Sequence, residues 1–186
     1  MRECGFVAWF TGLPGAGKST VAALVADELE SDGFLIDQLD GDVVRAQLWG
    51  ELGFSRTDRD AQVARVAWIA SRIARVGGIV LVSAISPYAD ARHRARQVVE
   101  EHVRFVEIFV STPLEECMRR DPKGHYARAI AGEIEAFTGV SDPYEAPTAA
   151  DIVVDTAGVD AATAAEIVIA GLRDLDMLTV VDRAVQ

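Results

Sequence analysis

One short segment, Gly12 followed by four residues and then Gly17-Lys18-Ser19, constrains the fold more than any other. It follows an apolar run at residues 5–11 (GFVAWFT), which is typical of a buried strand, and it precedes a helical pattern. Glycines allow the close turn that such a strand-to-helix connection needs. A strand, a glycine loop and a helix in this order indicate an α/β fold with parallel strands.

The rest of the chain repeats this alternation of short apolar runs and longer periodic ones. Four further strands are predicted at residues 34–39, 79–85, 104–110 and 151–155. Apolar side chains recur at steps of three and four over residues 57–76 and again over 160–178, which predicts two long helices. We therefore expect a mostly parallel five-stranded sheet in three layers, with helices on both faces.

At 186 residues the chain fits a single domain, 1–186, because domains usually span about 50–250 residues. One segment, at about residues 121–147, departs from the alternation: prolines and glycines surround one short helical stretch. So long an irregular connection in a compact domain is usually functional. We interpret it as a lid over the site, with a disordered loop as the alternative.

The net charge of −11 argues against a nucleic acid or a membrane as the main partner, since both are anionic. Cys4 and Cys117 form no metal-binding or redox motif, and we expect them to be free thiols. His93, His102 and His125 show no metal-binding spacing. The chain shows no signal-peptide pattern or apolar stretch of bilayer length, so a cytoplasmic location is expected.

The glycine loop has a specific physical use, which is the binding of nucleotide phosphates. Backbone N–H groups and a helix N-terminus can surround the phosphates, Lys18 adds a positive charge, and the Ser19 hydroxyl can ligate Mg²⁺. The alternative is a tight turn without a ligand. The sequence thus predicts a P-loop NTPase-type fold that binds ATP and Mg²⁺ through Gly12, Leu13, Pro14, Gly15, Ala16, Gly17, Lys18, Ser19 and Thr20.

Other residues must identify the acceptor of the phosphoryl group, because this kind of loop occurs in enzymes with many different reactions. Asp40 and Asp42 follow the second predicted strand, where parallel sheets place their ligands. They could orient an acceptor hydroxyl and hold Mg²⁺ through water, or they could form a turn that caps the next helix. Arg45 and Arg59 would suit an anionic acceptor, although each alone could be a surface charge.

Together these segments resemble the adenosine 5′-phosphosulfate (adenylyl-sulfate) kinases, which phosphorylate the 3′-hydroxyl of adenylyl sulfate. The matching stretches are GLPGAGKST at 12–20, LDGDVVR at 39–45, GFS at 53–55, DR at 58–59, ISPY at 85–88, and RDPKGHY with AGEIEAFTGVSDPYEAP within 120–147. The resemblance covers most of the chain, and its last block is not a general P-loop feature.

The resemblance implies ATP and Mg²⁺ as cofactors, adenylyl sulfate as the substrate, and a homodimer. It places Lys18, Asp40, Ser86 and Lys123 at the reaction centre. Asp40 would act on the acceptor hydroxyl, with Ser19 and Asp42 towards the metal. Phe54 and Phe137 would stack on adenine, unless they are core residues. The implied substrate-binding residues are Asp40, Asp42, Arg45, Phe54, Arg59, Gln62, Ile85, Ser86, Pro87, Lys123 and Phe137.

Three positions depart from the family pattern. Gln62 stands where an asparagine is usual, and Ala89 and Ile130 replace basic residues. Fewer cations would weaken the binding of an anionic substrate by about 1–3 kcal/mol for each missing contact. Two alternatives therefore remain: a related kinase for another nucleotide-like acceptor, and a nucleotide-binding regulator without catalysis.

Overall fold

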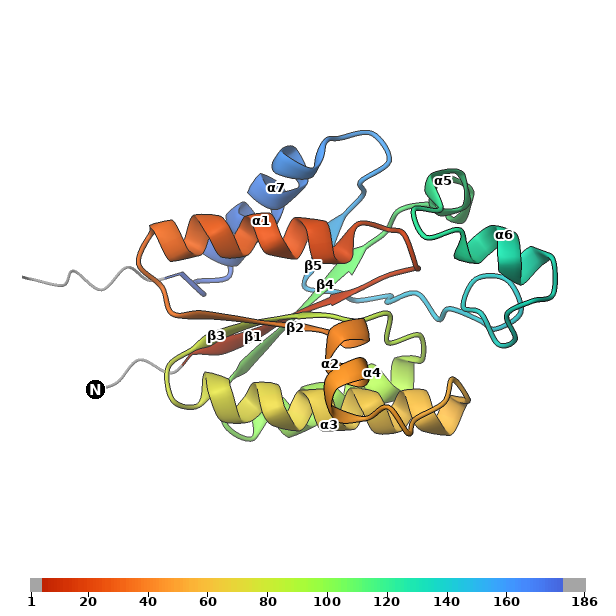
Figure 1. Cartoon of the computed structure of the whole chain (residues 1–186). Helices are drawn as coiled ribbons and strands as arrows, with labels where there is room; N and C mark the ends of the chain where they lie inside the picture. The colour runs from red at the N-terminus through yellow and green to blue at the C-terminus, as the bar shows by residue number, and fades with distance from the viewer. Residues whose placement is uncertain (1–4, 179–186) are drawn as a thin grey trace, which may run out of the picture.

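The structure is a computed structural model that describes residues 5–178, and in it these residues form one parallel sheet between two layers of helices (Figure 1). The strands are β1 (Phe6–Thr11), β2 (Ile36–Asp40), β3 (Ile79–Ser83), β4 (Arg104–Val110) and β5 (Ile152–Val154). The helices are α1 (Lys18–Ser31), α2 (Gly41–Leu48), α3 (Arg56–Ala74), α4 (Ala89–Glu100), α5 (Leu114–Arg120), α6 (His125–Ile130) and α7 (Ala161–Asp174). The strand order is β2-β3-β1-β4-β5, and every pairing is parallel, which confirms the predicted fold class.

The central strand β1 divides its side chains between two hydrophobic clusters, because successive strand residues point to opposite faces. Ala8 and Phe10 belong to the cluster under α1 and α7. Val7 and Trp9 belong to the cluster under α3 and α4. All six residues of β1 are buried, as a strand covered on both faces requires.

Several predicted boundaries extend a few residues too far, and two of these lie beside a residue with left-handed backbone. The strand predicted to end at residue 85 stops at Ser83, because the chain turns sharply at Ser86, whose φ is 45°. The helix predicted over 160–178 ends at Asp174, and Asp176 has a φ of 54°. Both deviations occur where a backbone in the left-handed region ends a regular element, which an apolar pattern does not encode.

The carboxyl ends of the strands share one edge of the sheet, and α5, α6 and the following segment gather there (Figure 1). The segment 121–147 contains α6 and one isolated bridge between Thr138 and Asp142. Its irregular course around a single short helix matches the expectation. Its opening and closing as a lid remains a prediction.

None of the helices in the described part of the chain has the length and apolar character needed to cross a membrane. Cys117 is a buried free thiol, as expected, whereas Cys4 lies outside the described residues.

Candidate active site

The glycine loop sits at the end of β1 and leads into α1. Gly17, the residue before α1, has a φ of 98°, a conformation that L side chains rarely adopt. A Cβ at Gly12 would lie 2.6 Å from the carbonyl oxygen of Val110, so the loop requires glycine there. The hydroxyls of Thr112 and Thr156 lie 3.0 and 2.9 Å from the Ala16 carbonyl oxygen and fix the loop from below.

Lys18 curls back over this loop. Its Nζ donates hydrogen bonds to the carbonyl oxygens of Gly12 at 3.1 Å and Leu13 at 2.9 Å. Burial lowers the pKa of Lys18 to about 8, although the carboxylates of Asp42 and Asp40 act in the opposite direction. The amine is therefore charged at neutral pH, and it lies where a phosphate chain on the loop would need a cation.

Asp40 ends β2 and uses its two carboxylate oxygens differently. Oδ1 accepts from the N–H groups of Asp42 at 2.9 Å and Val43 at 3.3 Å, and so caps α2. Oδ2 accepts a 2.5 Å hydrogen bond from the Ser19 hydroxyl. The two interpretations of this aspartate are therefore compatible, because one oxygen caps the helix while the other faces the phosphate loop.

The oxygens of Ser19 and Asp40 provide a hard-donor environment beside the loop, which suits Mg²⁺. In residues 5–178 no group of three or more His, Cys, Asp or Glu side chains is arranged to hold a metal. A cation here would thus need oxygen ligands from a nucleotide as well, and Mg²⁺ commonly binds in this way.

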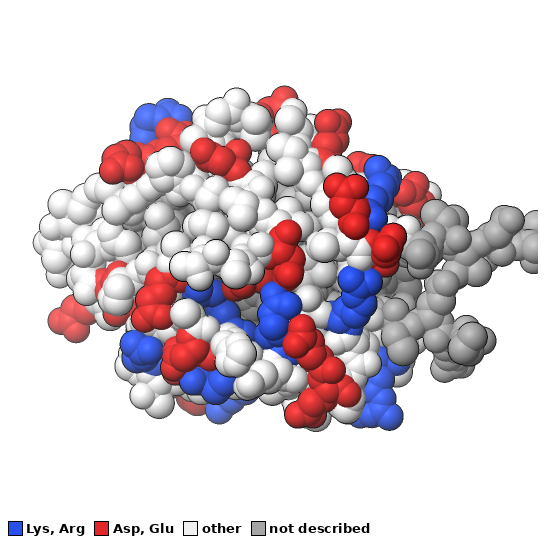
Figure 2. Space-filling view, turned by 180° about the vertical axis from the view of Figure 1, so that it is seen from behind, with Lys and Arg blue, Asp and Glu red and all other residues white. Residues whose placement is uncertain are grey.

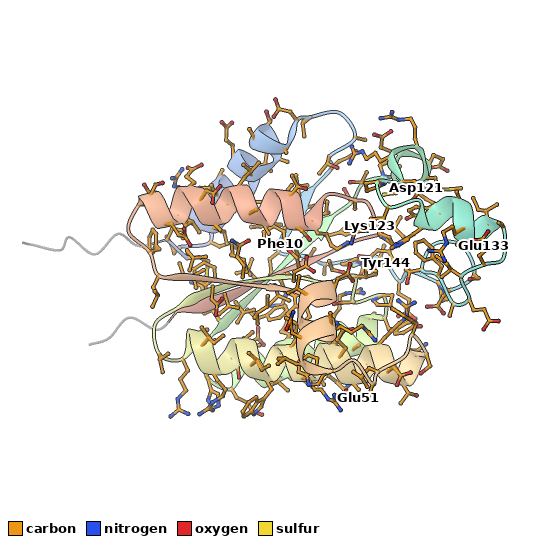
Figure 3. The ribbon with its side chains drawn as sticks, in the orientation of Figure 1. Phe10, Glu51, Asp121, Lys123, Glu133 and Tyr144 are labelled. Carbon is orange, nitrogen blue, oxygen red and sulfur yellow. The ribbon has the colours of Figure 1, made fainter. Side chains whose placement is uncertain are left out.

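Lys123 lies on the connection between α5 and α6, at the carboxyl-end side of the sheet (Figure 3). Its Nζ is 3.0 Å from Asp42 Oδ2, and both side chains are exposed. The hydrogen bond and the negative charge of Asp42 raise the pKa of Lys123. The segment 121–147, for which we keep the name of the predicted lid, therefore contributes a positive charge near the phosphate loop.

The lid is attached to the phosphate loop by Tyr126 of α6, whose hydroxyl donates to the Pro14 carbonyl oxygen at 2.9 Å. The carboxylate of Asp121 accepts from the N–H groups of Tyr126 and Ala127, both at 3.0 Å, which fixes the start of this helix (Figure 3).

On the opposite side of the cleft, Arg45 is held by its neighbours. It donates to the carbonyl oxygens of Leu52 at 3.1 Å and Gly53 at 2.5 Å, and to Gln62 Oε1. Gln62 also donates from Nε2 to the Gly41 carbonyl oxygen at 2.6 Å. The amide of Gln62 thus connects α3, Arg45 and the start of α2.

Arg59 is only 8% exposed and connects α3 to the lid. It donates to Phe54 O at 2.8 Å, to Thr138 Oγ1 at 2.9 Å and to Ala136 O at 2.5 Å. Three of its donor atoms therefore contact protein acceptors, and its charge lies at the wall of the cleft.

Phe54 and Phe137 both line this cleft, which has a volume of about 1160 Å³ and also includes the phosphate loop and Asp40. Phe54 is 61% exposed and carries the guanidinium of Arg45 at 4.8 Å from its ring centroid, so it is not a core residue. Phe137 packs partly on the core and meets Tyr126 edge to face at 5.0 Å. An exposed aromatic ring in a cleft suits stacking on a flat base.

Residues 85–87 form another wall of the cleft. Ser86 as a whole residue is 3% exposed, and its Oγ accepts a 3.0 Å hydrogen bond from Trp9 Nε1. This contact engages the hydroxyl of Ser86 with a core residue.

The altered positions outside α3 lie away from the cleft lining. Ile130 is 60% exposed at the end of α6, and Ala89 begins α4. Neither lines the cleft.

Sequence reasoning missed the residues that hold the walls in place, chiefly Arg92, Tyr144 and the pair Thr112 and Thr156. Arg92 is 4% exposed and forms a 2.8 Å ion pair with Glu107. Glu107 interrupts the apolar run that follows Arg104 in the strand RFVEIFV, and a charge inside such a run signals a buried partner. That signal could have found Arg92.

Comparison with known proteins bears on the identity of this cleft. The sequence pattern of the adenylylsulphate kinase family matches residues 4–155. The chain belongs to the adenylylsulphate kinase family. An adenylyl-sulfate kinase of Picosynechococcus is 46% identical over 96% of this chain and 99% of its own length. A probable adenylyl-sulfate kinase of Pseudomonas aeruginosa is 52% identical over 82% of this chain and 70% of its own.

Among solved structures, the adenylylsulphate kinase of Mycobacterium tuberculosis in complex with AMPPNP and APS superimposes with a TM-score of 0.88. It is 44% identical and covers 91% of this chain and 98% of that one. A gluconokinase from Sinorhizobium meliloti, at 18% identity and a TM-score of 0.56, shares the fold alone. The adenylylsulphate kinase likeness thus extends over the phosphate loop, both arginines and the lid.

Proposed function

We infer that this chain transfers the γ-phosphoryl group of ATP to the 3′-hydroxyl of adenylyl sulfate, giving 3′-phosphoadenylyl sulfate and ADP. One observation carries the inference: a single cleft contains the phosphate loop, Asp40, and the wall formed by Arg45, Arg59 and Phe54. The relatives named as adenylyl-sulfate kinases and the relative solved with AMPPNP and APS support the same assignment.

In this proposal the phosphate loop orients the ATP phosphates, and Lys18 and Lys123 balance their charge from opposite sides. Asp40 lies beside Ser19 at the end of β2, where it would align the acceptor hydroxyl and accept its proton. Phosphoryl transfer through a loose transition state depends mainly on such positioning and charge stabilisation. Phe54 and Phe137 would hold the adenine, with Arg45 and Arg59 towards the phosphosulfate.

We propose that Mg²⁺ is held by the Ser19 hydroxyl and, through water, by Asp42. Bound there, the ion would neutralise charge on the phosphate oxygens. Residues 85–87 would complete the acceptor wall, with Gln62 acting on Arg45.

The altered positions do not favour a different acceptor. Gln62 uses both ends of its amide on Arg45 and Gly41, and Ala89 and Ile130 are not part of the cleft lining. Adenylyl sulfate is therefore the acceptor that we propose.

A coupled assay of ADP release tests the function. Adenylyl sulfate should stimulate turnover well above the basal ATPase rate, whereas AMP, adenosine and a sugar acceptor should not. No stimulation by adenylyl sulfate, or equal stimulation by the other acceptors, would exclude the proposed function. Nucleotide binding without turnover on any acceptor would identify a regulator.

We also propose a homodimer in the cytoplasm. A related APS kinase from Thiobacillus denitrificans is described as hexameric, which supports self-association in the family. Light scattering after size exclusion would measure the oligomeric state, and a monomer at micromolar concentration would contradict the dimer.

A further inference from the structure

The carbonyl groups of residues 85–87, the wall beside the proposed acceptor, are all engaged with protein donors. Thr11 Oγ1 donates to Ile85 O at 2.7 Å. Arg92 donates to Ser86 O at 2.7 Å, and the N–H of Glu145 donates to Pro87 O at 2.8 Å. Three different elements therefore hold three consecutive carbonyls of this loop.

The loop is held in a conformation that a serine does not adopt readily. Ser86 has a φ of 45°, in the left-handed region, which costs on the order of 1–2 kcal/mol for such a residue. Such a backbone persists only where its surroundings determine it. Here Trp9 holds the Ser86 side chain and Arg92 holds its carbonyl oxygen.

Arg92 is the central member of this arrangement. Its Nε donates to Glu107 Oε1 at 2.8 Å, one terminal nitrogen donates to Ser86 O, and the other donates to Glu145 O at 2.7 Å. Its guanidinium also lies 5.9 Å from the ring centroid of Tyr144. One buried fork therefore connects α4, β4, the loop and the end of the segment 121–147.

The backbone N–H groups of the same loop differ from its carbonyl groups. In the described part of the chain, the N–H groups of Ile85 and Ser86 donate no hydrogen bond, and both residues line the cleft. Buried N–H groups are almost always paired in native proteins. Donors that lack a protein partner beside a cleft are suited to donate hydrogen bonds to an anionic or carbonyl oxygen of a ligand.

We propose that Arg92 is a positioning residue that holds the backbone of residues 85–87 so that its free N–H groups meet the acceptor substrate. Arg92 itself does not touch the substrate. The inference rests on the proposed function for the identity of that substrate, but the geometry of the loop does not depend on it.

Lysine cannot replace this arginine, because a single ammonium has no planar fork to reach three acceptors in different directions. Arg92→Lys is therefore the informative variant, since it keeps a positive charge beside Glu107. Where that variant does not fold, the paired change Arg92→Gln with Glu107→Gln removes both charges and retains hydrogen-bonding side chains. Arg94→Lys is the matched control on the same helix.

Arg94 is suited to this purpose because it is half exposed and pairs with Asp60 and Asp90 at the surface. Figure 2 shows positive and negative side chains interleaved over the lower half of the rear face. A change within such an exposed network leaves residues 85–87 untouched and has little effect on stability.

The first measurement is steady-state kinetics with each substrate varied. We expect Arg92→Lys to lower kcat/KM for adenylyl sulfate by about tenfold or more, while KM for ATP stays within about twofold. Arg94→Lys should resemble the wild type. An unchanged kcat/KM for adenylyl sulfate, or equal losses for both substrates, would overturn the positioning role.

The second measurement needs no turnover. Replacing Trp49 and Trp68 by Phe leaves Trp9 as the sole tryptophan, and Trp9 contacts Ser86 directly. Arg92→Lys in this background should shift the Trp9 emission, and Arg94→Lys should not. If the wild type does not use adenylyl sulfate, the proposed function is wrong, and the Trp9 emission then tests the role of Arg92 by itself. An emission spectrum that Arg92→Lys leaves unchanged would overturn the inference about the loop.

Discussion

Lys123 reaches across the cleft to Asp42, with 3.0 Å between Nζ and Oδ2. The two residues belong to different sides of the site, since Lys123 lies in the lid segment and Asp42 in the first turn of α2. Because both are exposed, their pairing contributes roughly 0–1 kcal/mol to stability. We therefore expect Lys123 to affect catalysis more than stability.

We accordingly expect Lys123→Ala to reduce kcat by about 10-fold to 100-fold, because a cation beside the transferred group stabilises the transition state. Its melting temperature should stay close to that of the wild type. Kinetics and thermal unfolding of the same preparations test this. Arg119→Ala, at another exposed position before the lid, should change neither quantity. Equal kinetics in the two variants would remove Lys123 from the mechanism.

Asp40→Asn should separate the two tasks of this residue. Asparagine is as good a helix cap as aspartate, so the stability should change by less than about 0.5 kcal/mol. Turnover should fall by about 100-fold or more, because the amide cannot accept the hydroxyl proton. ATP affinity, measured by calorimetry, should stay near the wild-type value. Asp37→Asn, at an exposed position in β2, is the control. Wild-type turnover in Asp40→Asn would contradict the role of Asp40.

Lys18 predicts a pH dependence of nucleotide binding. Its pKa of about 8 means that, before nucleotide binds, the charged form prevails below pH 8 and the neutral form above it. Phosphates favour the charged form, so ATP affinity should decline above pH 8, approaching about tenfold for each pH unit. Binding at pH 8.5 should also take up protons, which calorimetry in buffers of different ionisation enthalpy measures.

The same shift has a defined sign for stability. The pKa of Lys18 is lowered from 10.5 to about 8, so between these pH values the unfolded chain binds more protons at this residue. The contribution of Lys18 to folding therefore becomes less unfavourable as the pH rises through this window. In the binding experiment at pH 8.5, Lys18→Met should abolish the proton uptake that accompanies ATP binding. Uptake that persists in Lys18→Met would assign it to another group.

Arg59→Ala should loosen the lid. The variant removes three hydrogen bonds from a buried guanidinium, two of them to the lid residues Ala136 and Thr138. We expect the free energy of unfolding to fall by roughly 2–4 kcal/mol and the segment 131–142 to become sensitive to limited proteolysis. Arg65→Ala, on the same helix with an exposed partner, should do neither. Matching cleavage of both variants would show that Arg59 does not hold the lid.

Periodicity predicted the sheet well because buried parallel strands are apolar on both faces. The run at residues 104–110 coincides with β4, and the helix predicted at 57–76 corresponds to α3, Arg56–Ala74. The turn after Ser83 was missed because the left-handed backbone of Ser86 is held by side-chain contacts with Trp9, 77 residues away along the chain, and with Arg92 on the following helix. A local pattern contains no information about such contacts.

The residues of the candidate site also fall into those that the sequence could predict and those that it could not. Motif residues such as Lys18 and Asp40 were recognisable, because their chemistry requires those residue types at that spacing. Their placement in one cleft agrees with the expectation, while their individual roles remain predictions. The supporting residues were not recognisable: three arginines at alternate positions of α4 look alike in sequence, and only the fold buries Arg92 and exposes Arg94.

The support of the phosphate loop has a consequence for how the site comes into being. The Ala16 carbonyl oxygen is held by Thr112 and Thr156, which are 96 and 140 residues away along the chain. Contacts of such long range form late, because the chain must first close large loops. Nucleotide binding should therefore appear only with global folding. A refolding experiment followed with a fluorescent ATP analogue would show affinity arising together with the last folding phase.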